Sequence, residues 1–315
     1  MTDSPVIDSR VNNARVIKFM AWRRPALLLS AVLTAVCIGA IAFRGLVLGL
    51  DFSGGIQIEL QFPQPVAAET IRSQLDAAGF VNPVVAHFGS ESDLMIRLRE
   101  GGEDPATRVL AAVGTTENVA PEVKRVEFVG PQIGAELRDQ GGLALVLALL
   151  AILAYVAVRF QYKFALGGAL AVVHDTVVTV GFFAIFGLEF DLTVLAAVLT
   201  VIGYSINDTI VVFDRVRENF RLVRKGSPEE IMDLSMTQTL ERTLITSVAT
   251  LLVVIGLFLL GGDVLHNFSI ALMVGIIFGT YSSIYVASAL ALQLGVQRED
   301  LLLPVKDGSE FDGQP

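Results

Sequence analysis

The chain has 315 residues, of which 53% are hydrophobic and 17% are charged, and its mean hydropathy is +0.63. An average soluble domain has about 25% charged residues, so this composition excludes an ordinary soluble protein. The net charge of -9 argues against a nucleic-acid partner. The single cysteine, Cys37, and three scattered histidines predict no disulfide and no metal cluster. No P-loop or HExxH pattern occurs, so we expect a protein without cofactors that is not an enzyme.

Six apolar runs are each long enough to cross the hydrocarbon core of a bilayer, which takes about 20 helical residues. All six are predicted as helices, because irregular backbone facing lipid leaves polar groups unsatisfied. The sequence therefore predicts a polytopic α-helical membrane protein with a leading segment 1–24 and a tail 295–315. The predicted spans are 25–43, 141–158, 164–186, 192–213, 243–262 and 268–294.

The basic residues predict the orientation of the spans. They lie before the first span, between the second and third and between the fourth and fifth, whereas the loops 187–191 and 261–267 contain none. By the positive-inside rule, both termini are expected in the cytoplasm and residues 44–140 on the other side. The first span ends in Ala40-Ile41-Ala42, which also resembles a secretory cleavage site. We expect an uncleaved anchor, because the apolar run is long for a signal.

The cytoplasmic loop 214–242 is amphipathic. Val216, Phe220 and Val223 are expected to lie along the bilayer surface with the arginines facing outward. Ser227, followed by proline, is expected to cap a second short helix.

Residues 44–140 form a hydrophilic region between the first two spans. Its pattern predicts the order strand, helix, strand, strand, helix, strand, with a turn at 89–93. This order is the βαββαβ, ferredoxin-like arrangement, so we predict a small α+β periplasmic domain. The predicted elements are Gly55–Phe62, Ala67–Ala78, Val84–Phe88, Leu94–Leu98, Pro105–Val113 and Val123–Val129.

Ionisable side chains inside a span are costly and usually face a protein interior or a water path. Their neighbours at helical spacing are also polar, which places several of them on one helix face. These residues are His174 and Asp175 in the third span, Thr200, Tyr204, Asn207 and Asp208 in the fourth, and Arg242 at the start of the fifth.

Two interpretations of these residues remain open. They form a proton or cation relay, in which protonation of Asp208 weakens its attraction to Arg242, or they form a static ion pair that fixes helix packing. His174 and Asp175 have either a relay or a structural role. Adjacent residues on a helix point about 100° apart, so we expect these two not to form a hydrogen-bonded pair.

The last span carries a row of small residues. Gly275, Gly279 and Ser283 are spaced by four and therefore share one helix face. Such a row lets a neighbouring helix approach closely, so we predict a packing seam here.

Six motifs are spread along the chain: Asp51–Gly55, Val129–Leu137, His174-Asp175, Gly203–Asn219, Thr239–Ser247 and Gly279–Ile284. In sequence and in order they resemble the motifs of the SecF family of the resistance-nodulation-division superfamily. The resemblance covers the chain from about residue 16 to 290, and Ser53 stands where the family often has threonine.

The resemblance implies a subunit of the bacterial inner membrane that works in protein export. It implies SecD as the paired subunit, the SecYEG channel and YajC as further partners, and unfolded preproteins as substrates. It also implies that the proton-motive force drives late stages of export. Asp208 and Arg242 match the proton-path positions of the family, and a partner aspartate would lie on SecD.

Two glycine-containing segments connect the outer domain to the bundle. Glycine permits unusual backbone angles, so these segments are expected to act as hinges that couple the domain to the spans. The residues concerned are Asp51, Gly54 and Gly55 in the first segment and Gly130, Pro131 and Gly134 in the second.

Two other functions remain as alternatives. A small-molecule or lipid exporter of the same superfamily would need an apolar pocket in the outer domain. A scaffold subunit without transport activity would tolerate neutralisation of Asp208.

Overall fold

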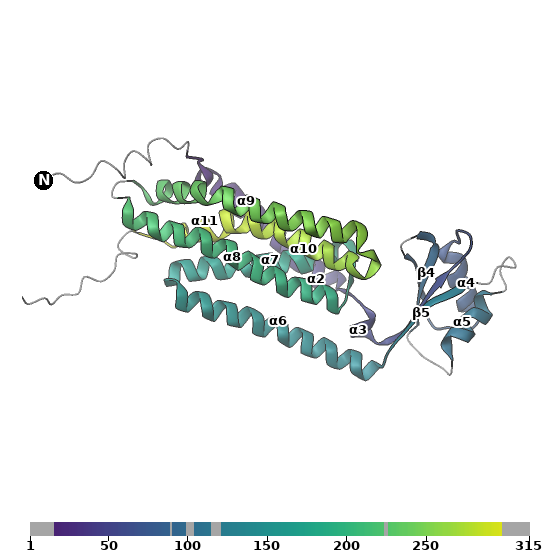
Figure 1. The fold of residues 1–315 in the computed structure, drawn as a ribbon. Helices are drawn as coiled ribbons and strands as arrows, with labels where there is room; N and C mark the ends of the chain where they lie inside the picture. Colours follow the sequence, from purple (N-terminus) through teal and green to yellow (C-terminus); the bar gives the residue numbers. More distant parts are fainter. Residues whose placement is uncertain (1–15, 89, 99–103, 115–120, 224–225, 298–315) are drawn as a thin grey trace, which may run out of the picture.

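The computed structural model describes residues 16–297 except 89, 99–103, 115–120 and 224–225. A long helix bundle carries a small domain of strands and short helices at one end, and the described N-terminal end lies at the other (Figure 1). The described C-terminal end lies beside the start of α7 (Tyr162–Phe186) at that same far end, where Lys163 donates a hydrogen bond to the carbonyl of Gly295. The outer domain and the described termini therefore lie at opposite ends of the bundle.

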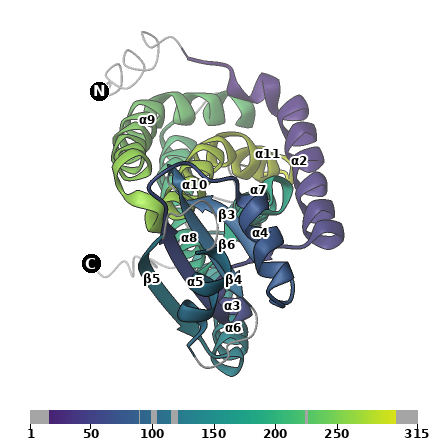
Figure 2. The ribbon, with the colours of Figure 1, turned by 90° about the vertical axis from the view of Figure 1, so that its right-hand side faces the viewer.

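Six helices of the described chain are long and apolar enough to span a membrane, which confirms the predicted number. They are η1 with α2 (Phe19–Trp22, Arg23–Arg44), α6 (Pro131–Arg159), α7, α8 (Leu192–Leu222), α9 (Pro228–Leu260), and α10 (Gly262–Ser282) with its continuations η2 (Ser283–Ala287) and α11 (Ser288–Gln293). In the end-on view, α7, α8 and α10 lie in the middle and α2, α6 and α9 around them (Figure 2). Most of the buried polar side chains of the bundle, such as Asp175, Ser205 and Ser282, therefore lie on the three central helices.

The prediction that residues 214–242 form a cytoplasmic loop lying along the bilayer surface is wrong. α8 continues without a break to Leu222, and Val216 and Phe220 are buried in the bundle core instead of lying on a bilayer surface. The predicted cap at Ser227 is present, since its side chain and that of Glu230 form a reciprocal capping box. The helix that follows is not short, because it continues as the fifth span.

The outer domain has the predicted βαββαβ order of elements. Its four strands pair antiparallel in the order β3-β4-β2-β5, and Ile58, Leu60 and Ile96 point from the sheet into the core beneath α4 and α5. The predicted turn at 89–93 is wrong, because β4 already begins at Ser90. The elements are β2 (Gly55–Gln61), α4 (Ala68–Ala77), β3 (Val84–Phe88), β4 (Ser90–Leu98), α5 (Pro105–Val113) and β5 (Glu122–Val129).

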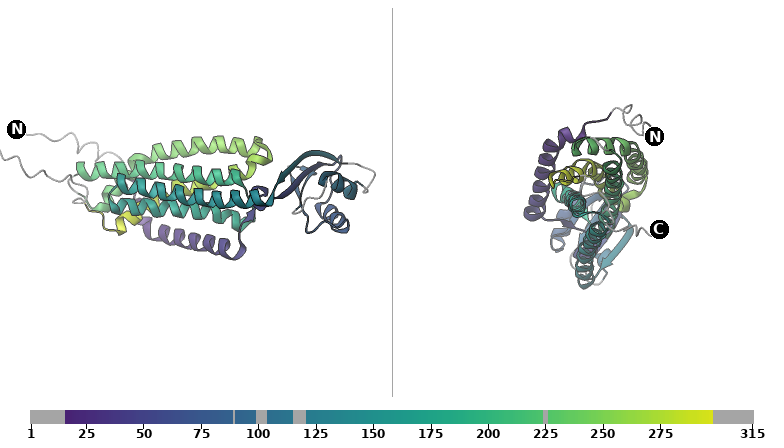
Figure 3. Two further views of the ribbon diagram at one scale, coloured as in Figure 1. Left: turned by 90° about the horizontal axis from the view of Figure 1, so that it is seen from below. Right: turned by 90° about the vertical axis from the view of Figure 1, so that its left-hand side faces the viewer.

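Three unpredicted short elements lie where the domain joins the bundle. β1 (Val47–Leu48) pairs parallel with β6 (Glu189–Phe190), and α3 (Leu50–Ser53) follows β1. Seen from below, the strands of the domain lead directly into the helices at this junction (Figure 3).

The two connecting segments pack tightly against each other. A Cβ atom on Gly134 would lie 2.8 Å from the backbone nitrogen of Gly54, and a Cβ on Gly54 would lie 2.8 Å from Cα of Pro131. Gly54 also has a φ of +67°, which L-residues rarely adopt. In this conformation the glycines therefore allow close backbone contact between the connections.

Candidate functional site

The buried carboxylate of Asp175 is the centre of a polar cluster at the meeting point of α7, α8 and α10. Its Oδ2 accepts hydrogen bonds from Ser205 and from Ser282, the latter at 2.6 Å. His174 lies beside it, with Nδ1 2.9 Å from Oδ1. Since a charge in a bundle is tolerated only when donors surround it, this set can hold either an ionised or a protonated carboxyl group. We call these four residues the Asp175 cluster.

The expectation that His174 and Asp175 cannot pair is therefore wrong. Their Cα–Cβ bonds diverge, but the two side chains are long enough to turn toward each other above the helix surface. The other ring nitrogen of His174, Nε2, is buried and has no hydrogen-bond partner among the described residues. The imidazole thus has one nitrogen at the carboxylate and one available to a further group.

Next to this cluster, three hydroxyl groups form a chain of hydrogen bonds between α8, α9 and α10. The hydroxyl of Tyr204 on α8 donates to Ser247 on α9 at 3.4 Å, and the Ser247 hydroxyl lies 2.7 Å from that of Thr280 on α10. Tyr204 adjoins Ser205 in the sequence, so α8 presents neighbouring residues to both groups. Hydroxyls can donate and accept, which suits them to pass a proton along a chain.

Asp208 lies one helical turn farther along α8 and is buried, with only 3% of its surface exposed. Its Oδ2 has no hydrogen-bond partner within the described chain. Arg242 on α9 lies within electrostatic range of Asp208, but the two side chains form no direct ion pair in the described part of the chain. The predicted partners are thus neighbours without being in contact, and an acceptor oxygen remains for a proton or another donor.

The remaining predicted relay residues face outward. Thr200, Asn207 and Arg242 are exposed on the surface of this chain, and the Thr200 hydroxyl bonds only to the Ala196 carbonyl of its own helix. Exposed polar groups at membrane depth are unfavourable against lipid, so this face of α8 and α9 favours contact with protein or water.

The small-residue row on α10 lies against α8. A Cβ on Gly275 would come within 2.1 Å of Cγ2 of Val201, and one on Gly279 within 3.3 Å of Cβ of Ser205. Ser283 lies instead at the start of the π-helical η2, where its hydroxyl donates to the carbonyl of Thr280. Gly279 thus lets Ser205 approach Asp175.

The π-helical segment η2 begins directly after Ser282. A π-turn inserts one extra residue into a helix and occurs frequently at functional sites. Here it separates the end of α10, which carries the Asp175 contacts, from α11.

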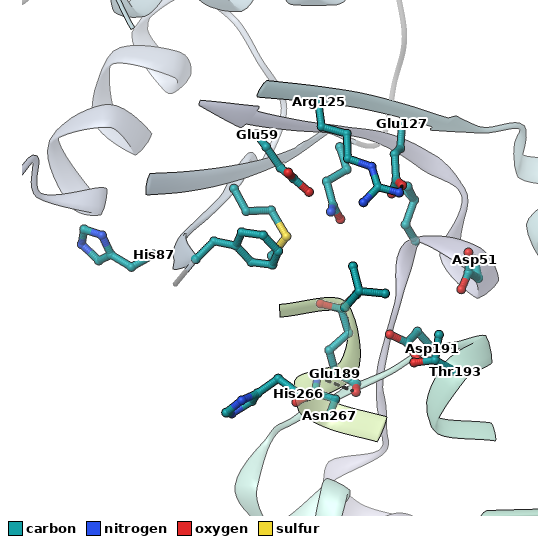
Figure 4. Close-up of a pocket in the computed structure, with 15 residues that line it drawn as sticks. Asp51, Glu59, His87, Arg125, Glu127, Glu189, Asp191, Thr193, His266 and Asn267 are labelled. Carbon is teal, nitrogen blue, oxygen red and sulfur yellow. Dashed lines mark hydrogen bonds and ion pairs between the residues drawn. The ribbon is translucent and has the colours of Figure 1, made fainter. Parts of the chain in front are cut away.

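A polar cavity of about 680 Å³, which we call the junction pocket, lies between the outer sheet and the bundle. Figure 4 shows Glu59, Arg125 and Glu127 on the sheet side and Asp51, Glu189 and Asp191 on the bundle side. Asp51, expected at a hinge, accepts a hydrogen bond from the backbone N–H of Leu192 at 3.1 Å, in addition to the N-cap that Asp191 provides at the start of α8.

Glu189 on β6 connects the two parts of the molecule. Its carboxylate forms an ion pair with Arg97 on β4, and its carbonyl accepts a hydrogen bond from Asn267 near the start of α10. Burial raises the pKa of Glu189, Arg97 opposes that shift, and nearby Asp191 adds to it. Glu189 therefore links β4 of the outer domain to α10 of the bundle.

Sequence reasoning missed Ser205, Ser282, Ser247 and Thr280. All four lie inside or beside the motifs of the fourth, fifth and sixth spans, which was the available signal. No group of three or more His, Cys, Asp or Glu residues in the described parts of the chain could hold a metal ion.

Comparison with known proteins identifies the family. The model of "Protein export membrane protein SecD/SecF, C-terminal" matches residues 109–297, and that of the "SecD/SecF GG Motif" matches residues 39–66. The protein translocase subunit SecF of Vibrio alginolyticus is 50% identical over 96% of this chain and 98% of its own length. The chain belongs to the SecF family.

Two more SecF relatives are similar over most of their length. The subunit of Escherichia coli O157:H7 is 44% identical over 96% of this chain and 95% of its own, and that of Pseudomonas aeruginosa is 48% identical over 91% and 94%. The crystal structure of SecDF from Thermus thermophilus, a translocon-associated membrane protein, superposes with a TM-score of 0.82 at 38% identity. That match covers 89% of this chain but only 38% of the SecDF chain. The SecF family is thus shown in both sequence and fold.

Proposed function

We propose that this chain is a proton-driven subunit of the protein-export machinery of the bacterial inner membrane. In this proposal it pairs with SecD, works beside the SecYEG channel with YajC as a further partner, and promotes the late release of unfolded preproteins. The names of its relatives support the transport role, since they are translocase subunits, and favour it over export of small molecules.

The observation that carries the proposal is the buried Asp208 oxygen without a partner. The oxygens of a buried carboxylate normally accept hydrogen bonds, because a buried charged group without a partner costs about 1–3 kcal/mol or more. Asp208 lies beside exposed polar residues on α8 and α9, where a second subunit would complete the site. Protonation of Asp208 would then change its attraction to Arg242, and the bundle would respond to proton entry.

The path proposed for the proton includes the two polar groups deeper in the bundle. The Asp175 cluster and the hydroxyls of Tyr204, Ser247 and Thr280 provide groups that donate and accept within the three central helices. A proton that moves through 100 mV releases about 2.3 kcal/mol, which is enough to bias a two-state element.

The proposed orientation places both termini in the cytoplasm and the outer domain in the periplasm. The basic residues at the end of the bundle opposite the domain support it. Single-cysteine labelling with an impermeant reagent, in a Cys37→Ala background, tests it. Labelling of a cysteine at position 218 from outside intact spheroplasts would reverse the topology.

The test of the proton role is Asp208→Asn, which keeps shape and removes the charge. We expect the variant to assemble with SecD and to lose the stimulation of preprotein release by an imposed proton gradient in membrane vesicles. Thr34→Ala, whose hydroxyl bonds only to its own helix, serves as the control variant. Gradient-dependent release at the wild-type rate in Asp208→Asn would remove this residue from the mechanism.

A further inference from the structure

A small basic cavity lies at the end of the bundle that is far from the outer domain. It has a volume of about 360 Å³, and its lining includes Arg159 at the end of α6 and Arg217 and Arg221 on the last turns of α8. Asp214 and Glu218 complete its charged lining. Three positive and two negative side chains give a net charge of +1. We call this cavity the arginine pocket.

The carboxylates do not neutralise the arginines fully. Asp214 is shared, because it accepts from Arg159 at 3.0 Å and lies 3.7 Å from Arg217. Glu218 accepts a hydrogen bond at 2.6 Å from Arg215, which is not part of the lining. The Nε atom of Arg217 is buried and has no hydrogen-bond partner among the described residues. The lining thus has a net positive charge, and Arg217 has a donor without a partner in the described part of the chain.

An aromatic ring holds two of the guanidinium groups in position. The Cζ atoms of Arg159 and Arg217 lie 5.1 Å and 5.6 Å from the ring centroid of the buried Phe160. Cation–π contact of this kind restricts the side chains and keeps like charges close together. Planar guanidinium groups brought together in this way match the oxygens of a phosphate group.

The position of the pocket indicates the source of the phosphate. α6 ends at Arg159, directly after its apolar run, so the pocket lies at the depth of the lipid headgroups. In the proposed orientation it faces the cytoplasmic leaflet, whose anionic lipids bind to basic pockets between helices. We propose that Arg159, Arg217 and Arg221 bind the phosphate group of an anionic phospholipid. This proposal does not depend on the proton path.

The simplest alternative is that these arginines only set the topology, which requires charge near the membrane but no binding geometry. The test compares lipid retention by the purified full-length protein from micelles that contain phosphatidylglycerol or phosphatidylcholine. We expect phosphatidylglycerol to be retained preferentially. Arg159→Gln with Arg217→Gln should lower that retention by about fivefold for each arginine removed. Arg24→Gln, an exposed arginine at the same end of the bundle, is the matched control and should lower retention less than the loss of either pocket arginine, because it lies outside the pocket.

Two further measurements keep the proposal falsifiable. Arg217→Lys retains the charge and the fold but loses the planar fork, so intermediate retention is expected even if the double variant does not fold. Inorganic phosphate separates the two sources of the ligand: if it raises the thermal stability and phosphatidylglycerol does not, the lipid assignment is wrong. Equal retention of both lipids, or an equal loss in Arg24→Gln, would also overturn the proposal.

Discussion

Ser282 donates a hydrogen bond to Asp175 at 2.6 Å, although the two residues are 107 positions apart in the sequence. The contact joins α10 to α7 through a buried carboxylate, and Ser205 on α8 adds a second donor. Hydrogen bonds to one aspartate therefore join three helices from different parts of the chain.

Removal of one of these donors should destabilise the bundle. Ser282→Ala leaves Asp175 with one hydroxyl fewer, and we expect a loss of about 1–3 kcal/mol in stability. Thermal unfolding in detergent measures it, with Thr34→Ala as the control. The double variant with Asp175→Asn should lose less than the sum of the single variants, because the two groups interact. Additive losses would show that the contact contributes little.

The double variant Asp208→Asn with Arg242→Gln separates relay from packing. Since the two side chains do not touch, removing both charges should leave the fold and SecD binding intact. We expect a folded protein without gradient-driven preprotein release. Arg242→Lys should also impair release, because lysine is a point charge that loses its proton more easily. Wild-type release by the double variant would instead favour a static packing role.

An added methyl group where α10 packs closely against α8 should destabilise the protein. Gly275→Ala places Cβ against Val201, and we expect a cost of about 1–3 kcal/mol in unfolding free energy. Gly256→Ala is the matched control, because nothing lies within 4 Å of its added Cβ. Val201→Ala should partly rescue Gly275→Ala by restoring the space. If Val201→Ala does not rescue Gly275→Ala, the loss of stability does not come from a clash with Val201.

The junction should become more stable on mild acidification through Glu189. Its pKa is raised mainly by burial, so the folded protein binds a proton at a pH where the unfolded chain does not. Stability from this group is therefore fully present below the unfolded value and is lost as the pH rises through the folded value. Lowering the pH from neutral toward the ordinary pKa of a glutamate should raise the melting temperature of the wild type relative to Glu189→Gln. If the melting temperatures of the wild type and of Glu189→Gln change in parallel with pH, the prediction is wrong. Glu69→Gln, which changes an exposed glutamate on α4, is the control.

Much of the architecture could be predicted from the sequence, because hydropathy and the spacing of apolar residues reflect which residues are buried. Six spans follow from apolar runs of sufficient length, and the order of elements in the outer domain follows from alternation and turn residues. The continuation of α8 to Leu222 could not be predicted in this way. An amphipathic helix shows the same pattern whether Val216 and Phe220 face lipid headgroups or another helix.

The candidate site could be predicted only in part. Ionisable residues such as Asp175 and Asp208 stand out in a span, because burying an ionisable group in a membrane is costly. Ser205 and Ser282 do not stand out, because serine is common in membrane helices and its partner is decided by tertiary packing. The distance between Asp208 and Arg242 depends on how α8 and α9 are rotated, and helical spacing alone cannot give that rotation.

α9 runs without interruption for 33 residues from the capping box at Ser227 to Leu260. At 1.5 Å per residue, it is a rod of about 50 Å that crosses the membrane and projects beyond it. At its first turn Glu229 forms an ion pair with Arg23, and beyond its last turn the chain reaches Asn267, which bonds to Glu189 at the junction pocket. Because the helix is continuous, a displacement of its first turn would be transmitted along its whole length to the end that adjoins the junction pocket, without any change within the helix itself.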